Sequence, residues 1–247
     1  MTKQRVDVLL VEQGLVPSRA RAQALVLAGA VVESVSGRRL DKPGAQLADD
    51  VELRLKDQPL PYVSRGGLKL AAALERFAID PRGRVCLDVG ASTGGFTDCL
   101  LQHGASRVYA IDVGYNQLAF NLRQDPRVVV HERCNIRHAP PELVPEPCSL
   151  LVVDVSFISL KLVLPAARQF LAPGAVLAAL VKPQFEVGRA DVGKGGVVRD
   201  PAARQRALDE VATCAAELGF YGLQTLDSPI LGAKGNHEFL LGGALAS

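Results

Sequence analysis

The feature that most constrains this chain is the run LDVGASTGG at residues 87–95. It continues the apolar segment RVCLDV at 84–89, which is typical of a strand covered by helices on both faces. It leads into FTDCLLQHG at 96–104, which indicates a short helix ended by a glycine. Glycines let the backbone turn tightly and pass close to a ligand, and they stand here at Gly90, Gly94 and Gly95. The run therefore predicts a ligand-binding corner in a parallel sheet.

The next apolar segment, RVYAID at residues 107–112, ends in an acid. This acid, Asp112, stands roughly 20 residues beyond Gly90, about where nucleoside-binding folds place a carboxylate for the ribose hydroxyls. We therefore predict that Asp112 binds a ribose. The competing interpretation is that Asp88 and Asp112 only cap loops and that the glycines only form a turn. The acid at the second strand end favours the nucleoside site.

The residue at position 92 narrows the class of nucleoside. The dinucleotide pattern GxGxxG needs a glycine two places after the first, so that a pyrophosphate can approach bare backbone, and here that place is Ser92. A cofactor without pyrophosphate would tolerate the side chain. S-adenosylmethionine is such a cofactor, so the sequence favours a methyltransferase over a dehydrogenase.

An α/β-hydrolase is the rival interpretation of the same corner. Residues 90–94 also match GxSxG, the elbow that presents a nucleophilic serine, and the chain order permits a triad of Ser92, Asp154 and His237. That elbow normally follows several strands of its sheet, whereas little before residue 84 resembles a strand of this sheet. We therefore interpret Ser92 as a loop residue.

Composition limits the class of protein. Hydrophobic residues make up 48% of the 247 residues, enough for one large core and a small extra module, and the formal net charge is +2. Five cysteines form no CxxC pair and four histidines form no cluster, so we expect reduced thiols and no metal. No apolar run approaches the roughly 18 residues of a membrane helix. We expect a cytoplasmic protein with no membrane partner.

Prolines and glycines near residue 60 predict a domain boundary, with a small domain at 1–59, a linker at 60–64 and a large domain at 65–247. In the small domain we expect helices at about 5–13 and 19–28, the second capped by Ser18, packed on a small sheet.

The second helix carries two kinds of residue. Arg19 and Gln23 share one face, with Arg21 beside them, and this face could hold phosphates. An ordinary solvated face is the alternative. The residues predicted to face inward are Ala20, Ala24, Leu27 and Ala28.

The stretch RVDVLLVEQGLVPSRARAQALVLAGAVVE resembles the S4 RNA-binding domain, whose pattern opens the first helix with an arginine and an aspartate and places SR before the second. The resemblance spans roughly residues 1–60. It implies backbone contacts to RNA, which position a protein without reading sequence, from Arg5, Ser18, Arg19 and Arg21.

Four charged residues of the large domain come from distant segments. Lys69 lies in the predicted helix SRGGLKLAAALERF, for which Ser64 is a candidate N-cap. Asp154 and Lys182 end the apolar strands predicted at 150–157 and 175–186, and Glu238 begins the last one. Strand ends of parallel sheets line the ligand crevice, and the four formal charges cancel, as a buried cluster requires.

This set resembles the lysine, aspartate, lysine and glutamate tetrad of FtsJ-like RNA ribose 2′-O-methyltransferases. With the S4-like module it resembles the TlyA family, often labelled hemolysins. The motifs that carry the resemblance are YVSRGGLKL, LDVGASTGGFTDCLL, VVDVSFISL, VKPQFE, KGGVVRD and NHEF. It implies an α/β protein, a Rossmann-like S-adenosylmethionine-dependent methyltransferase domain preceded by a small S4-like α+β domain. It also implies methylation of a cytidine 2′-hydroxyl in ribosomal RNA of the large subunit and, in some members, of the small subunit. The predicted partners are ribosomal RNA or ribosomal subunits.

The resemblance implies a role for each charged residue. Lys182 would act on the ribose hydroxyl as the attack begins, either as a neutral base or as a cation beside the alkoxide, and Asp154 would orient it. Lys69 and Glu238 would position the hydroxyl and balance charge. The predicted cofactor residues are Asp88, Gly90, Ser92, Gly94, Phe96, Asp112, Asn135 and Asp154.

The segment KGGVVRD is either a lid that touches RNA phosphates through Lys194 and Arg199 or an exposed loop. A third class of function also stays open beside the methyltransferase and the hydrolase. It is an RNA-binding factor that keeps the S4-like module and performs no catalysis.

Overall fold

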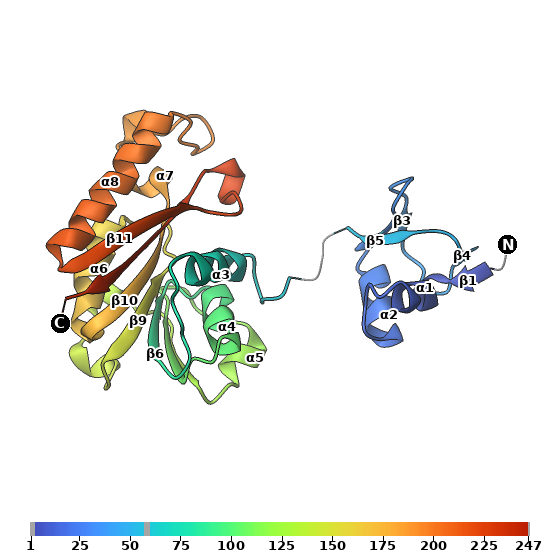
Figure 1. Cartoon of the computed structure of the whole chain (residues 1–247), viewed down its shortest axis with the longest axis horizontal. Coiled ribbons are helices and arrows are strands. Elements are labelled where there is room, and N and C mark those ends of the chain that lie inside the picture. Colours follow the sequence, from blue (N-terminus) through green and yellow to red (C-terminus); the bar gives the residue numbers. More distant parts are fainter. Residues whose placement is uncertain (1–2, 57–59, 247) are drawn as a thin grey trace. The chain divides into compact units, whose positions relative to one another are not determined.

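The computed structural model describes residues 3–56 and 60–246, and the chain divides into two compact units, residues 1–60 and 61–247 (Figure 1). Residues 1–2, 57–59 and 247, which include the end of the predicted small domain, lie outside the described part. No helix among the described residues is both long and apolar enough to cross a membrane.

The large unit is built on one seven-stranded sheet with the order β11-β12-β10-β9-β6-β7-β8. Its strands are β6 (Val85–Val89), β7 (Arg107–Ile111), β8 (Val128–His131), β9 (Cys148–Val153), β10 (Leu171–Val181), β11 (Phe220–Asp227) and β12 (Phe239–Leu245). The pairs among β6, β7, β8, β9 and β10 are parallel, and β12 runs antiparallel to both β10 and β11. The sequence before residue 84 showed little that resembles a strand of this sheet. In the described part of the chain, no strand of the sheet indeed precedes residue 84.

Helices cover both faces of this sheet (Figure 1). One face carries α3 (Gly66–Arg76), α4 (Gly95–Gln102) and α5 (Phe120–Arg123), and the other carries α6 (Leu160–Ala167), α7 (Pro183–Glu186) and α8 (Pro201–Glu217). Five short 3₁₀ turns also lie in the described part of the unit: η1 (Ile136–His138), η2 (Pro141–Leu143), η3 (Arg168–Phe170), η4 (Arg189–Asp191) and η5 (Ala233–Gly235). This is the predicted α/β architecture.

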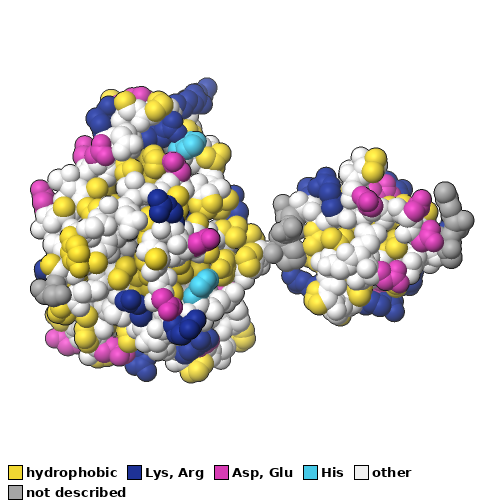
Figure 2. Space-filling model, viewed as in Figure 1, with side chains coloured by type: hydrophobic (Ala, Val, Ile, Leu, Met, Phe, Trp, Pro, Cys, Tyr) yellow, Lys and Arg dark blue, Asp and Glu magenta, His cyan; other side chains and the backbone are white. Residues whose placement is uncertain are grey.

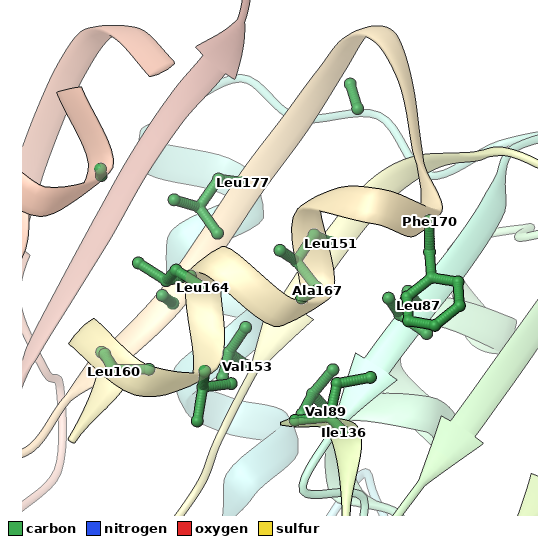
Figure 3. Packing of buried hydrophobic residues seen from close by; sticks show 14 of the residues in the cluster. Leu87, Val89, Ile136, Leu151, Val153, Leu160, Leu164, Ala167, Phe170 and Leu177 are labelled. Atoms are coloured by element: carbon green, nitrogen blue, oxygen red, sulfur yellow. The ribbon is translucent and has the colours of Figure 1, made fainter. Parts of the chain in front are cut away.

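The core explains why the central strands are largely apolar. Leu160 and Leu164 of α6 pack against Leu151 and Val153 of β9, and all four are buried (Figure 3). The opposite face of the sheet packs on α3 and α4. Because both faces are covered, these strands lack the polar alternation of a half-exposed sheet.

The strand order reverses between β6 and β9. The chain runs from β6 outward through β7 to β8, then returns to β9 on the other side of β6. In open parallel sheets the crevice beyond the carboxyl ends of the strands at such a point receives the ligand. The glycine corner follows β6, so it lies at this crevice.

The described part of the small unit contains two helices and two small sheets. Its helices are α1 (Val6–Glu12) and α2 (Arg19–Leu27), and its strands are β1 (Lys3–Arg5), β2 (Val31–Glu33), β3 (Arg39–Leu40), β4 (Gln46–Ala48) and β5 (Leu53–Leu55). β1 pairs with β4, and β2 lies between β3 and β5. The predicted cap of α2 is confirmed, since Ser18 Oγ accepts from Arg21 N at 3.3 Å.

The predicted inward face of α2 is wrong. Ala22 and Val26 are buried there, whereas the residues expected inside are exposed: Ala20, Ala24, Leu27 and Ala28. The reason is electrostatic, because the buried acid Asp7 of α1 bonds with Arg19 and Gln23 and so turns their side of α2 towards α1. In an alanine-rich helix the hydrophobic pattern alone does not determine which side faces inward, so such polar contacts can decide it.

Candidate functional site

The glycine corner brings the ends of β6 and β9 into close contact. Gly90 has a φ of +88°, and a Cβ built on it would lie 2.5 Å from the carbonyl oxygen of Asp154. Asp154 N donates to Val89 O at 3.0 Å, which ties the two strand ends together. A side chain at residue 90 would therefore strain the backbone and also separate the strand ends.

Two hollows meet at this corner. The larger encloses about 600 Å³ and the smaller about 290 Å³. Small-molecule sites enclose roughly 300–1,000 Å³, so the larger hollow alone has the size of a ligand site. The residues that line both hollows are Gly90, Ser92, Asp154 and Ser156. Two ligands held one in each hollow would therefore meet at Asp154.

The larger hollow contains two residues predicted to bind a nucleoside. Asp112 accepts from Ser92 N at 2.8 Å and from Gly114 N at 2.6 Å, so each carboxylate oxygen fixes one loop and keeps a further lone pair. Asn135 accepts from Arg137 N at 3.2 Å through Oδ1, which leaves its amide nitrogen for a ligand. Both residues line this hollow.

Two of the residues that were predicted to bind the cofactor do not line either hollow. Gly94, with a φ of +95°, packs against α5, where an added Cβ would lie 2.3 Å from Leu122 Cδ1. Asp88 is fully buried and accepts from Thr97 Oγ1 at 2.6 Å. Burial raises the pKa of Asp88 to about 7. Both residues contribute to the structure of the corner, and their contact with the cofactor stays a prediction.

The smaller hollow contains an ion pair at the ends of two parallel strands. Lys182 Nζ lies 2.6 Å from Asp154 Oδ1 and donates to Ser156 Oγ at 2.8 Å. Asp154 follows β9 and Lys182 follows β10, and neighbouring parallel strands end at the same edge of a sheet. Sequence reasoning did not identify Ser156, although it stands two residues beyond the predicted Asp154.

A second ion pair lies beside the first. Lys69 Nζ donates to Glu238 Oε2 at 2.5 Å, and both side chains are largely buried. Lys69 projects from α3, whereas Glu238 precedes β12, whose antiparallel course brings its start to the edge where β10 ends. Four residues from distant segments thus meet as two pairs of opposite charge, as buried ions require.

Glycines keep the space between these groups open. A Cβ on Gly232 would lie 1.9 Å from Glu238 Oε1, and one on Gly95 would lie 2.2 Å from Ser64 Oγ. Ser64, the predicted N-cap, accepts from Gly66 N at 3.3 Å through its Oγ, as an N-cap side chain does, although the regular part of α3 begins only at Gly66. Ser64 also lines the smaller hollow. Phe96, a predicted cofactor residue, is buried at the wall of the same hollow.

The hydrolase alternative is wrong. Ser92 Oγ donates to Gln117 Oε1 at 3.2 Å, and Asp154 is paired with Lys182. In the part of the chain that the structure describes, no bond joins Ser92, Asp154 and His237. The corner therefore lacks the base that would activate a serine nucleophile.

The predicted RNA-contacting residues are exposed apart from Arg5, which is half-buried, and several have internal partners. Arg5 and Arg19 bond with Asp7, and the Ser18 hydroxyl caps α2. The loop with Lys194 and Arg199 folds back through a bridge between Gly193 and Val197. Its turn is held by the buried Asn236, whose amide donates to Gly196 O at 2.9 Å and accepts from Val198 N at 3.1 Å.

Family comparisons divide the chain in the same way as the two units. A model of the FtsJ-like methyltransferases matches residues 62–245, and a model of the S4 domain matches residues 4–52. A solved structure of a Streptococcus thermophilus protein is 47% identical, with a TM-score of 0.76, and covers 100% of this chain and 90% of its own.

Two curated relatives match nearly the full length. The 16S/23S rRNA (cytidine-2′-O)-methyltransferase TlyA of Mycobacterium tuberculosis is 49% identical over 96% of this chain and 88% of the relative. Hemolysin A of Brachyspira hyodysenteriae is 42% identical over 96% of this chain and 98% of the relative. The resemblance to the TlyA family is confirmed, and the chain belongs to the FtsJ-like methyltransferases.

Proposed function

We propose that this protein transfers a methyl group from S-adenosylmethionine to the 2′-hydroxyl of a cytidine in ribosomal RNA. The observation that carries the proposal is the meeting of Lys69, Asp154, Lys182 and Glu238 beside the glycine corner. A methyl transfer needs two ligands held at one point, and Asp154 lines both hollows. The specific base and RNA come from the Mycobacterium relative.

The larger hollow fits an adenosine with an amino acid tail. Asp112 offers carboxylate lone pairs to ribose hydroxyls, and Asn135 offers its amide nitrogen to a base edge. Gly90 exposes bare backbone where the two hollows join. When bound, S-adenosylmethionine supplies an electrophilic methyl on a sulfonium. The corner would direct this methyl towards the smaller hollow, where the charged residues lie.

Lys182 is the residue that we propose acts on the ribose oxygen. Its ammonium donates to Ser156 Oγ and forms an ion pair with Asp154 Oδ1, and it has further N–H groups for the attacking oxygen. We infer that Lys182 acts as an ammonium that stabilises negative charge as it develops on that oxygen. The hydroxyl proton leaves as the new oxygen–carbon bond forms, and the Asp154 carboxylate can accept it.

Lys69 and Glu238 hold the acceptor nucleotide in this proposal. The carboxylate of Glu238 fixes the Lys69 ammonium at the wall of the smaller hollow, and Lys69 lines that hollow. Lys69 can donate to a ribose or phosphate oxygen without changing the net charge of the cluster. Exposed Lys194, Arg199 and Arg21 would contact RNA phosphates farther from the reacting oxygen.

Transfer of labelled methyl from S-adenosylmethionine to ribosomal RNA or to isolated subunits tests the proposal. Labelled RNA with the unchanged chain, and none without protein, is the expected result. RNA binding without cofactor affinity would support the noncatalytic RNA-binding factor instead. Ester hydrolysis that Ser92→Ala abolishes would restore the hydrolase.

A further inference from the structure

The small unit contains a buried acid with three donors around it. Asp7, the second residue of α1, has a side chain that is 0% exposed. Arg5 bonds it twice, from Nε to Oδ1 and from Nη2 to Oδ2, each at 2.9 Å. Arg19 Nη2 lies 3.3 Å and Gln23 Nε2 lies 2.8 Å from Oδ2. Bonds from Arg5, Gln23 and Arg19 lower the pKa of Asp7, so the acid is ionised in the folded chain.

The two arginines also face solvent. Their side chains are 43% exposed for Arg5 and 57% exposed for Arg19. In the described part of the chain, no other bond is made by Arg5 Nη1 or by Nε and Nη1 of Arg19. Each guanidinium thus has N–H groups on an inner edge that bind Asp7 and further N–H groups available outside.

The backbone holds Arg5 from another side. A Cβ on Gly44 would lie 3.3 Å from Arg5 Nη1, so a larger residue there would press on the guanidinium. The same segment is bonded to the start of α1, through Val6 N to Ala45 O and Asp7 N to Pro43 O, both at 3.0 Å. Arg5 is therefore confined by an acid on one side and by backbone on another.

On the face of this unit that Figure 2 shows, the charges do not form a single basic surface. Figure 2 shows Lys and Arg side chains interspersed with Asp and Glu over the visible face of the small unit. General attraction to a polyanion would therefore be weak here. Affinity for an anion would depend on a few cations held in the right geometry.

We propose that Asp7 is a positioning residue that holds Arg5 and Arg19 together as one preorganised site for a phosphodiester group of RNA. The three ionised groups have a net charge of +1, with the negative charge inside and the positive charge outside. Arginine binds phosphate through two parallel N–H groups, and a fixed guanidinium loses less rotamer freedom on binding. The inference rests on the proposed function, because it takes RNA as the substrate.

The direction in which one substitution changes RNA affinity distinguishes the preorganised site from an effect of net charge alone. Asp7→Asn removes a negative charge, which should tighten RNA binding if only net charge matters. The asparagine can accept through one oxygen only and points an N–H group at the arginines. The preorganised site therefore predicts about tenfold weaker binding, the loss of roughly one charge-assisted hydrogen bond. Asp49→Asn, which removes the same charge from an exposed side chain of the same unit, should leave binding unchanged or slightly tighter.

Binding is measured on the full-length chain by the fluorescence anisotropy of a labelled fragment of ribosomal RNA. Thermal unfolding and cofactor affinity of each variant are measured alongside. If Asp7→Asn fails to fold, RNA binding by Arg5→Lys tests the inference instead. This variant keeps the positive charge and loses the paired bonds to Asp7. Several-fold weaker binding by Arg5→Lys supports the site.

Two results overturn the inference. One is RNA binding by folded Asp7→Asn that is as tight as that of Asp49→Asn, and the other is unchanged binding by Arg5→Lys. Both results concern the variants alone, so methylation by the unchanged chain still tests the proposed function separately. Absence of RNA binding by the unchanged chain would contradict both.

Discussion

The Lys182 ammonium lies 2.6 Å from the Asp154 carboxylate, and each residue follows one of two neighbouring parallel strands. The sheet therefore fixes the positions of both residues, because no loop separates either charged residue from the strand that precedes it. A group that must align with an attacking oxygen benefits from such a rigid support.

Lys182→Ala should lower the rate of methyl transfer at least about 100-fold, because developing charge on the ribose oxygen loses its hydrogen-bond donor. The affinity for S-adenosylmethionine should change little, since Lys182 lines only the smaller hollow. Single-turnover transfer and equilibrium binding of the cofactor measure the two effects. Lys161→Ala is the matched control, because Lys161 pairs with exposed Glu210 between α6 and α8.

The charge state of Lys182 is tested by Lys182→Arg. Arginine keeps the positive charge and cannot act as a neutral base. We expect transfer well above that of Lys182→Ala. Equal loss in the two variants would contradict the role of the ammonium and favour a neutral base.

Glu238→Gln should lower the rate of transfer about tenfold or more, because the buried Lys69 ammonium loses its anionic partner. Lys69→Met removes the other member of the pair. In the double variant the effects should be clearly less than additive, as expected for two groups that act as a unit. A double-mutant cycle on the transfer rate measures this coupling, and strict additivity would mean that the two residues act separately.

Gly90→Ala should abolish most cofactor binding and destabilise the fold, because an added Cβ meets the Asp154 carbonyl oxygen at 2.5 Å. Gly83→Ala is the matched control. Gly83 also has a positive φ, +71°, but an added Cβ there meets nothing within 4 Å. The control should lose about 1 kcal/mol from the backbone conformation alone and keep cofactor affinity. Denaturant unfolding and cofactor titration distinguish the two; similar losses in both variants would refute the close approach.

Asp112→Asn should weaken S-adenosylmethionine binding about tenfold, because asparagine cannot accept from Ser92 N and Gly114 N together and also bind a ribose. Transfer at saturating cofactor should stay near that of the unchanged chain. Calorimetric titration gives the affinity, with the exposed Asp209→Asn as control. Unchanged affinity in Asp112→Asn would place the nucleoside elsewhere.

Asp88 should make the stability of the fold depend on pH. Burial raises its pKa to about 7, whereas an aspartate in the unfolded chain titrates near about 4. Below about pH 4 both states hold the proton and the contribution to stability is fully present. As the pH rises from about 4 to 7 only the unfolded chain releases the proton, so stability falls.

The comparison of the unchanged chain with Asp88→Asn isolates this effect from other titrating groups. The free energy of unfolding of the unchanged chain, relative to that of the variant, should decline across this range and level off above about pH 7. Denaturant unfolding at several pH values provides the measurement. Parallel pH curves for the two chains would show that Asp88 does not titrate there.

The sequence predicted the corner well because each of its parts is local. An apolar strand, a glycine turn and a capped helix follow from neighbouring residues alone. The meeting of Lys69 with Glu238 joins residues 169 positions apart, which no local pattern reveals. The family resemblance, rather than periodicity, predicted that set.

The errors have physical causes too. The rotation of α2 depends on the bond from Arg19 to Asp7, which hydrophobic pattern cannot show. Ser156 carries no distinctive signal, since its hydroxyl matters only because Lys182 lies beside it.

The chemical position of the transferred methyl tests the central claim most directly. Ribosomal RNA labelled by the unchanged chain is hydrolysed with alkali, which cleaves after every nucleotide with a free 2′-hydroxyl. We predict that the label appears in an alkali-resistant dinucleotide whose first nucleoside is cytidine, and that Lys182→Ala yields none. Label in single nucleotides would show methylation of a base, and it would contradict the assignment of the two ion pairs to ribose chemistry.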